Sequence, residues 1–436
     1  MLARKALKDL RYWKSHKDKQ ALLIDGARQV GKTYLVRAFA RESYENLAEL
    51  NFIENDTAAA AISSARNAEE LFIRLSAFLD GNLVPHKTLI FLDEIQECKN
   101  VGTAIKFLVD RYPEYDYILS GSLLGVELKN IRSVPVGYLD SITMYPLDFE
   151  EYCWAKGLST QVIDAARDSF NRREEIDQFV HQKLLGLFHE YLIVGGMPNP
   201  VERFISSSNI LDARKVQENI IARYREDISK YAEGRERIIK RIFDLIPAEL
   251  SAQNKRFTVS DIEGDSHVDR YENDFAWLAD AGVALPVYNV DEPRSPLAIA
   301  QKRTLFKLFL SDIGLLSCLC GMDVTRDLLA GRSDILYGAI YENAVAQELI
   351  CQGFPLYYFK NSSIGELDFL IERSSMNVLP IEVKSGKTYK RHSALTKAMK
   401  KENYHFEEAL VLYEGNVEVG ENDIVHAPVY CAAFLS

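Results

Sequence analysis

The chain has 436 residues, too many for one ordinary hydrophobic core, so we expect about two to four domains. Its content of 47% hydrophobic and 26% charged residues is typical of soluble globular protein, and no window approaches the roughly eighteen apolar residues of a membrane span. A net charge of −11 argues against a surface coated in positive potential for nucleic acid, although it does not exclude local basic patches.

The N-terminal segment, residues 1–19, is basic and lacks the apolar stretch of a secretory signal. It predicts a basic helix that carries Leu7, Leu10 and Trp13. The six cysteines of the chain show neither C-x-x-C pairs nor zinc-ligand spacing, which favours reduced thiols and a cytoplasmic location.

Residues 20–150 alternate apolar strands with helical patterns, which predicts a mainly parallel sheet with helices on both faces. Ligands of such a fold bind beyond the carboxyl ends of the strands. The predicted strands are Ala21–Asp25, Leu47–Ile53, Thr88–Leu92, Tyr117–Leu119 and Ile142–Tyr145, with helices that include Glu69–Leu79 and Thr103–Val109.

The first of these strands is followed by a complete G-x-x-x-x-G-K-[ST] motif, and a helical stretch comes next. Backbone N–H groups of such a loop wrap phosphates, Lys32 reaches the β- and γ-phosphates, and the Thr33 hydroxyl holds Mg²⁺. The motif predicts ATP and Mg²⁺ as ligands; the alternative is a glycine turn between strand and helix. The residues expected to bind ATP here are Gly26, Ala27, Arg28, Gln29, Val30, Gly31, Lys32 and Thr33.

Two carboxylates, Asp93 and Glu94, end the apolar strand that lies about sixty residues after the loop. We expect Asp93 to hold Mg²⁺ through water and Glu94 to orient and polarise the attacking water. A third strand ends at Ser120, which is our candidate for the polar side chain between that water and the γ-phosphate. The alternative for Ser120 is an N-cap or turn serine.

An arginine near the γ-phosphate usually completes such a catalytic site. The sequence offers Arg28, Arg111 and Arg132 and does not choose among them.

The middle of the chain predicts two further domains. Residues 151–235 are expected to form a helical lid that is interrupted at Gly195-Gly196-Met197-Pro198. Residues 236–330 carry the amphipathic segment Ile238–Leu250, a second helix and the β-rich run Val283–Val290, which suggests a winged-helix-like domain.

Residues 331–436 predict a long helix, Leu336–Cys351, followed by strands. In a strand, residues two apart share a face, so Glu366 points with Asp368, and Glu382 with Lys384. Three acids and a lysine suit coordination of Mg²⁺, and Glu342 in the preceding helix can add a ligand. The alternative is an alternating edge strand with a surface salt bridge.

Four segments together resemble a family of prokaryotic AAA-type ATPases that carries a C-terminal domain of unknown function. They are Gly26–Thr33, Ile90–Gln96, Leu119–Ser122 and Tyr145–Glu151. The resemblance implies that Pro198, in the family's Gly-Gly-x-Pro segment, lies near the adenine. Many relatives have Gly-Arg where this chain has Gly137-Tyr138, so that arginine's role is vacant or filled by another residue.

The C-terminal acids and lysine resemble the PD-(D/E)xK nuclease superfamily, as Glu342, Asp368, Glu382 and Lys384. The resemblance implies Glu342, Asp368 and Glu382 as metal ligands, and Asp368, Glu382 and Lys384 as catalytic residues.

Two functions follow from these predictions. The leading one is an Mg²⁺-dependent ATPase coupled to a nuclease-like domain that interacts with DNA through patches such as residues 384–401. The alternative is a slow ATPase switch with a non-catalytic C-terminal interaction domain. A protein partner or a homo-oligomer fits either function, since an ATPase can borrow an arginine from a neighbouring subunit.

Overall fold

The structure, a computed structural model, describes residues 2–18, 20–79, 82–98, 101–122, 137–232, 234–252, 256–264, 270–330, 335–373, 377–386 and 390–435. The chain forms two compact units. The N-terminal unit comprises Arg4–Tyr145 together with the short segment Asp280–Gly282. The C-terminal unit comprises the residues up to Ala3, Pro146–Ala279 and Val283–Ser436.

The N-terminal unit is built on a five-stranded sheet with the order β2-β3-β4-β1-β5. Every neighbouring pair in it is parallel, which confirms the predicted parallel sheet. The strands are β1 (Ala21–Asp25), β2 (Asn46–Asn51), β3 (Thr88–Asp93), β4 (Asp116–Ser120) and β5 (Leu139–Thr143).

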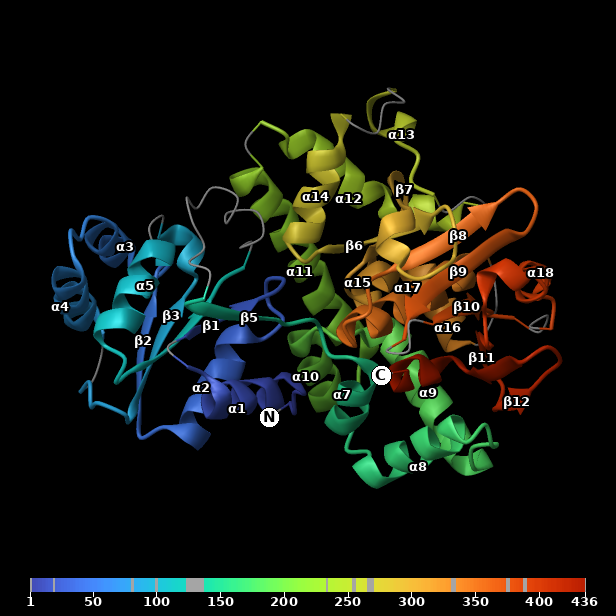
Figure 1. Ribbon diagram of the computed structural model, residues 1–436, viewed down its shortest axis with the longest axis horizontal. Helices are drawn as coiled ribbons and strands as arrows, with labels where there is room; N and C mark the ends of the chain where they lie inside the picture. The colour runs from blue at the N-terminus through green and yellow to red at the C-terminus, as the bar shows by residue number, and fades with distance from the viewer. Residues whose placement is uncertain are drawn as a thin grey trace. The chain divides into compact units, whose positions relative to one another are not determined.

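Helices cover both faces of this sheet (Figure 1). One face packs against α3, α4 and α5 around a core that includes Leu23, Leu50 and Leu92. On the other face α1 packs on α2, where Arg11 and Glu42 form an ion pair with 2.6 Å between Nε and Oε1. The helical elements of this unit are α1 (Ala6–His16), α2 (Lys32–Ser43), α3 (Asp56–Ser63), α4 (Ala68–Phe78), η1 (Ile95–Glu97) and α5 (Val101–Arg111).

The C-terminal unit begins with helices. Asp148 starts the first of them with a capping box, because its carboxylate accepts from the Glu151 N–H while the Glu151 side chain accepts from the Asp148 N–H. Its helical elements are α7 (Phe149–Ala155), α8 (Thr160–Asn171), α9 (Gln178–Val194), α10 (Pro198–Ser207), α11 (Ile210–Tyr231), α12 (Glu236–Ser251), α13 (Ser260–Glu263), α14 (Glu272–Asp280), η3 (Leu297–Ala300), α15 (Ile313–Leu319), α16 (Met322–Leu329), α17 (Ile335–Cys351), α18 (Ser393–Met399), η4 (Glu402–Tyr404) and η5 (Val429–Phe434).

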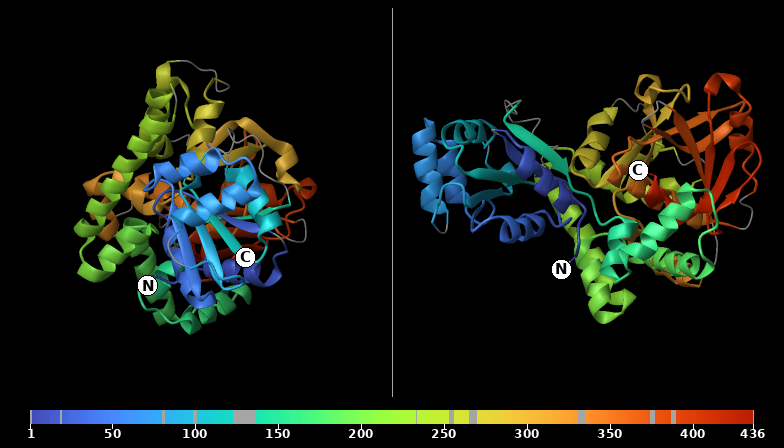
Figure 2. Two further views of the ribbon diagram at one scale, coloured as in Figure 1. Left: turned by 90° about the vertical axis from the view of Figure 1, so that its left-hand side faces the viewer. Right: turned by 60° about the horizontal axis from the view of Figure 1, so that its bottom comes forward.

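An eight-stranded mixed sheet with the order β12-β13-β11-β10-β9-β8-β6-β7 forms the rest of this unit. Its orange and red strands lie side by side in the right-hand view of Figure 2. The strands are β6 (Ala284–Val290), β7 (Gln301–Leu310), β8 (Tyr357–Asn361), β9 (Gly365–Glu372), β10 (Val378–Val383), β11 (Ala409–Tyr413), β12 (Glu418–Val419) and β13 (Ile424–Pro428).

The predicted boundary at residues 330/331 passes through this sheet. Strand β6 pairs with β7 on one side and with β8 on the other, so the edge of the expected β-wing is not free. The backbone groups of an edge strand are a template for pairing, and here β8 uses them. The segments 236–330 and 331–436 therefore contribute strands to one sheet.

At Gly195-Gly196, between α9 and α10, the backbone lies in close contact with the segments that contain Leu147 and Asp312. A Cβ atom on Gly196 would lie 2.0 Å from the Leu147 carbonyl oxygen, and one on Gly195 would lie 2.4 Å from Asp312 Oδ1. Asp312 is fully buried and accepts hydrogen bonds from the N–H groups of Gly196 (2.6 Å) and Leu315 (2.9 Å). Pro198 then occupies the first turn of α10, where its missing N–H costs nothing.

We expect replacement of Asp312 by asparagine to change how stability depends on pH. Burial raises the pKa of Asp312 from 3.8 to about 6, although four backbone N–H groups oppose the shift. Between these values the folded state binds more protons than the unfolded state, so Asp312 lowers the unfolding free energy as pH rises, by up to about 3 kcal/mol. Urea denaturation at pH 5 and pH 8 should show the wild type losing about half of this increment, about 1.4 kcal/mol, and Asp312→Asn lacking the loss.

The exposed Asp323→Asn, in the first turn of α16, is the matched control and should keep the wild-type pH dependence. A wild type that gains stability relative to Asp312→Asn as pH rises would contradict the expected sign.

Within the described residues, no helix combines the length and apolar character that crossing a bilayer requires.

Candidate nucleotide-binding site and carboxylate cluster

The G-x-x-x-x-G-K-[ST] loop joins the end of β1 to the start of α2 at the carboxyl edge of the parallel sheet. A Cβ atom on Gly26 would lie 2.1 Å from the Met144 carbonyl oxygen, so only glycine allows this approach. The guanidinium of Arg4 braces the loop from outside, because it donates to the carbonyl oxygens of Val30 (2.8 Å) and Tyr145 (2.6 Å). This role of Arg4 was not predicted from the sequence.

The Lys32 side chain is buried against its own loop. Its ammonium donates to the carbonyl oxygens of Gly26 (2.7 Å) and Ala27 (2.9 Å) and lies 3.5 Å from Ser122 Oγ. Burial lowers the pKa of Lys32 to about 8, although Glu94, Asp25 and Asp93 oppose the shift. A phosphate group is a stronger partner for this ammonium than two neutral carbonyls are.

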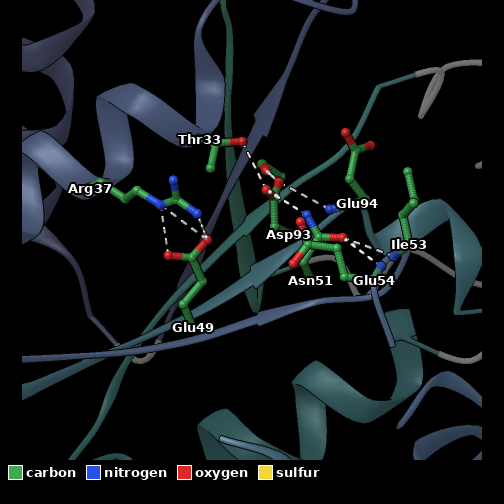
Figure 3. Close-up of polar contacts among 9 residues, drawn as sticks. Thr33, Arg37, Glu49, Asn51, Ile53, Glu54, Asp93 and Glu94 are labelled. Atoms are coloured by element: carbon green, nitrogen blue, oxygen red, sulfur yellow. Dashed lines mark hydrogen bonds and ion pairs between the residues drawn. The ribbon is translucent and has the colours of Figure 1, made fainter. Parts of the chain in front are cut away.

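Asp93 is the centre of a hydrogen-bond network at the ends of β2 and β3 (Figure 3). Its Oδ2 accepts from Thr33 Oγ1 at 2.8 Å and from Asn51 Nδ2 at 3.3 Å, and its Oδ1 accepts from the Glu94 N–H at 3.1 Å. Burial raises the pKa of Asp93, against the hydrogen bonds from Ser120 and Thr33. Asn51 was not predicted as a site residue. Its position at the end of the strand that pairs with β3 could have indicated that it lies beside Asp93.

Ser120 ends β4 and Ser122 follows it, and the two serines have different partners. Ser120 Oγ donates to Asp93 Oδ1, whereas Ser122 Oγ donates to Glu94 at 3.1 Å. Glu94 has a positive φ of 55° and also accepts from Gln96 Nε2 at 2.7 Å. The hydroxyl that lies between Lys32 and Glu94 therefore belongs to Ser122, which the sequence reasoning passed over.

The three arginines proposed from sequence separate in space. Arg28 lies in the loop, and Arg132 falls outside the described residues. Arg111 ends α5, which runs back from the carboxyl end of β3 to the beginning of β4. Arg111 therefore lies at the opposite edge of the sheet from the loop and is ruled out as an arginine acting within its own site.

A turn from far along the sequence also belongs to this compact unit. In Asp280–Gly282, Gly282 has a φ of +70°, and a Cβ atom on it would lie 2.8 Å from the Ala27 nitrogen. Asp280 also contributes to raising the pKa of Asp25, after burial, which is the main cause. The turn connects α14 to β6, so its two ends continue into the C-terminal unit.

The predicted C-terminal site residues come together on β9 and β10. Lys384 Nζ lies 2.5 Å from Glu382 Oε1, and the Val383 N–H donates to Asp368 Oδ2 at 2.9 Å. The antiparallel pairing of β9 with β10 ends at Ile381 and Phe369, and Glu382 and Asp368 are the next residues on the two strands. We call this group, with Glu366 and with Glu342 of α17, the carboxylate cluster.

Lys307 of β7 reaches into the carboxylate cluster, which the sequence did not predict. Its side chain is 1% exposed, and its Nζ lies 2.7 Å from Glu366 Oε1, 3.5 Å from Glu342 Oε2 and 3.9 Å from Asp368 Oδ1. Among the described residues, no group of three or more His, Cys, Asp or Glu side chains is arranged to hold a metal ion. The cluster therefore does not fit the metal site predicted at Glu342, Asp368 and Glu382, because an ammonium stands among the acids.

The basic patch at 384–401 is partly neutralised. Lys384 pairs with Glu382, and Lys390 lies 3.2 Å from Glu418 Oε1, while Lys387 falls outside the described residues.

Comparison with known families agrees with the geometry of the loop. Residues 18–153 match the family model described as an AAA domain. They form an AAA-type P-loop ATPase domain. Residues 185–326 and 337–432 of the chain match two domains of unknown function, DUF8612 and DUF4143. The second match covers the carboxylate cluster except for Lys307, which lies in the first.

Solved structures resemble the chain at low identity. The Walker-type ATPase PABY2304 of Pyrococcus abyssi is 14% identical, with a TM-score of 0.43 over 73% of this chain and 96% of that one. The Aeropyrum pernix ORC1 protein in complex with DNA is 13% identical, with a TM-score of 0.24 over 74% and 92%. Drosophila ORC bound to DNA is 13% identical, with a TM-score of 0.28 over 77% and 98%. No curated protein is significantly similar in sequence.

Proposed function

We propose that the ATPase domain binds ATP with Mg²⁺ and hydrolyses it slowly. The observation that carries this proposal is the 2.8 Å contact between Thr33 Oγ1 and Asp93 Oδ2 beside the Lys32 ammonium. A hydroxyl and a carboxylate at the base of a phosphate loop are oxygen donors of the kind that Mg²⁺ prefers. When bound, Mg²⁺ would neutralise charge that develops on the phosphates.

The side chains of the domain have separate roles in this proposal. The loop N–H groups and Lys32 hold the β- and γ-phosphates, and Thr33 and Asp93 hold the metal. Glu94 accepts the proton of the attacking water, and Ser122, which already donates to Glu94, positions that water. Ser120 orients Asp93 instead of the water.

We further propose that the nucleotide state is passed to a C-terminal unit that acts as an interaction domain without nuclease activity. Two observations support this switch over the nuclease. Lys307 stands among the acids of the carboxylate cluster, and Tyr138 stands where the resemblance to AAA-type ATPases implies an arginine. The Asp280–Gly282 turn offers a direct link, because it touches the loop at Ala27 and is continuous with α14 and β6.

That Pro198 lies near the adenine is a hypothesis that rests on the family resemblance. Its position at the start of α10 accounts for the proline without a ligand.

A DNA-processing ATPase with a nuclease-like domain is the second candidate. The positions of Asp368 and Glu382 next to the paired residues of β9 and β10, with Lys384 beside Glu382, favour it. The succession of α12, α13, α14, β6 and β7 is also compatible with a winged helix, which could place a helix in the DNA major groove. DNA contact would then use residues 384–401, and an arginine from a second copy or a protein partner could complete the ATPase site.

Measuring ATP hydrolysis with and without DNA separates the two functions. We expect Mg²⁺-dependent turnover that DNA does not change, and no cleavage of DNA or RNA with Mg²⁺ or Mn²⁺. Stimulation by DNA, or cleavage that Asp368→Ala and Lys384→Ala each remove, would favour the second candidate. Absence of any hydrolysis would disprove the ATPase proposal itself.

A further inference from the structure

The carboxylate cluster brings four acids and three lysines together inside the C-terminal unit. Lys307 contacts Glu366, Glu342 and Asp368, Lys360 Nζ lies 2.7 Å from Glu366 Oε2, and Lys384 pairs with Glu382. Lys360 and Lys384 are partly exposed, with side-chain accessibilities of 41% and 27%, whereas Lys307 is at 1%. Lys307 is thus the inner cation of the cluster, and the other two lysines stand at its rim.

A buried lysine is stable only where its charge is compensated. Burial alone would lower the pKa of Lys307, but Glu342, Glu366 and Asp368 outweigh that effect and raise it well above its ordinary value. Burial would likewise raise the pKa of Glu366, yet Lys307 and Lys360 lower it to about 2. Glu366 and the Lys307 ammonium are therefore charged together at neutral pH, and each compensates the burial of the other.

The acids that a metal would need are already engaged by protein groups. Asp368 gives Oδ2 to the Val383 N–H and faces Lys307 with Oδ1, and Glu382 gives Oε1 to Lys384. Two buried oxygens of the cluster, Glu342 Oε2 and Glu382 Oε2, accept no hydrogen bond from the described residues, and Glu342 Oε2 instead lies 3.5 Å from Lys307 Nζ. One ammonium that meets three carboxylates supplies the positive charge that would otherwise come from a divalent ion.

We propose that the Lys307 ammonium occupies the cation position of the carboxylate cluster and excludes divalent metals from it. The acids are then held together by an internal ion-pair network, and removal of Lys307 uncovers a site for Mn²⁺ or Mg²⁺. The proposal does not depend on ATP hydrolysis, because all the residues involved lie in the C-terminal unit.

Mn²⁺ binding to the full chain, measured by the loss of the free-ion EPR signal, tests this assignment. The test uses an Asp93→Asn background without nucleotide, so that the ATPase site does not contribute. We expect the background protein not to bind Mn²⁺ at millimolar concentration, and Lys307→Met to bind it at least about tenfold more tightly and gain thermal stability on binding. Lys384→Met, which removes a rim lysine, should behave as the background does.

Equal Mn²⁺ binding with and without Lys307 would overturn the proposal, as would a folded Lys307→Met that binds no Mn²⁺. If Lys307→Met does not fold, the charge-balanced Lys307→Met/Glu366→Gln variant decides. That variant loses one charge of each sign, so it should recover the fold, as judged by circular dichroism, and leave Mn²⁺ unbound. If it fails to fold or binds Mn²⁺ tightly, charge compensation by Lys307 is not the reason for the arrangement.

Discussion

Replacing Glu94 by glutamine should leave ATP binding intact and reduce hydrolysis by about 10²- to 10⁴-fold, the usual contribution of a general base. Glutamine keeps an oxygen that can accept from Ser122 and Gln96, so the turn after β3 should retain its geometry. It cannot accept a proton from water at neutral pH. Single-turnover hydrolysis with radiolabelled ATP, together with equilibrium binding of a fluorescent ATP analogue, measures the two effects separately.

Glu97→Gln is the matched control, because it makes the same chemical change three residues on, at the end of η1. Glu97 lines a surface pocket with Phe52 and Asp56. The Glu97→Gln variant should hydrolyse ATP at the wild-type rate. Wild-type turnover in Glu94→Gln would show that another group activates the water.

Replacing Lys32 by alanine should abolish measurable ATP binding. The ammonium is the buried positive charge of the loop, and its loss leaves the β- and γ-phosphates facing Asp93 and Glu94 without compensation. Isothermal titration calorimetry with Mg²⁺-ATP measures the loss. Arg41→Ala, an exposed change in the last turn of the same helix, should bind as the wild type does.

The same lysine predicts how ATP affinity depends on pH. In the free domain the pKa of Lys32 is about 8, and bound phosphate favours the charged form. Above pH 8 binding must therefore take up a proton, so the Kd should rise with pH, approaching about tenfold per unit. Below pH 8 the ammonium is already charged, and its contribution should be level. A Kd that stays constant between pH 8 and pH 9.5 would contradict this origin of the affinity.

The sequence predicted the ATPase domain well because its signals are local. The loop Gly26–Thr33 and the strand that ends at Asp93 each fit within a few neighbouring residues, and the parallel sheet brings their ends to one edge. Asn51 and Ser122 were missed because each is an ordinary polar residue after a strand. Only the register of β2 and β3 sets Asn51 beside Asp93, and only the path of the chain after β4 puts the Ser122 hydroxyl next to Glu94.

The sequence alone determined the phosphate loop, the acids that follow β3 and the carboxylates of β9 and β10, because alternation along a strand decides which side chains share a face. Tertiary structure alone decided that β6 and β7 belong to the C-terminal sheet, and that Lys307 stands among those carboxylates. Two strands, β6 and β8, separate β7 from β9 in that sheet, and no periodicity within β7 encodes a partner so distant. The Lys307 ammonium makes this cluster an ion-pair network and not a metal site. Only long-range packing defines the position of Lys307.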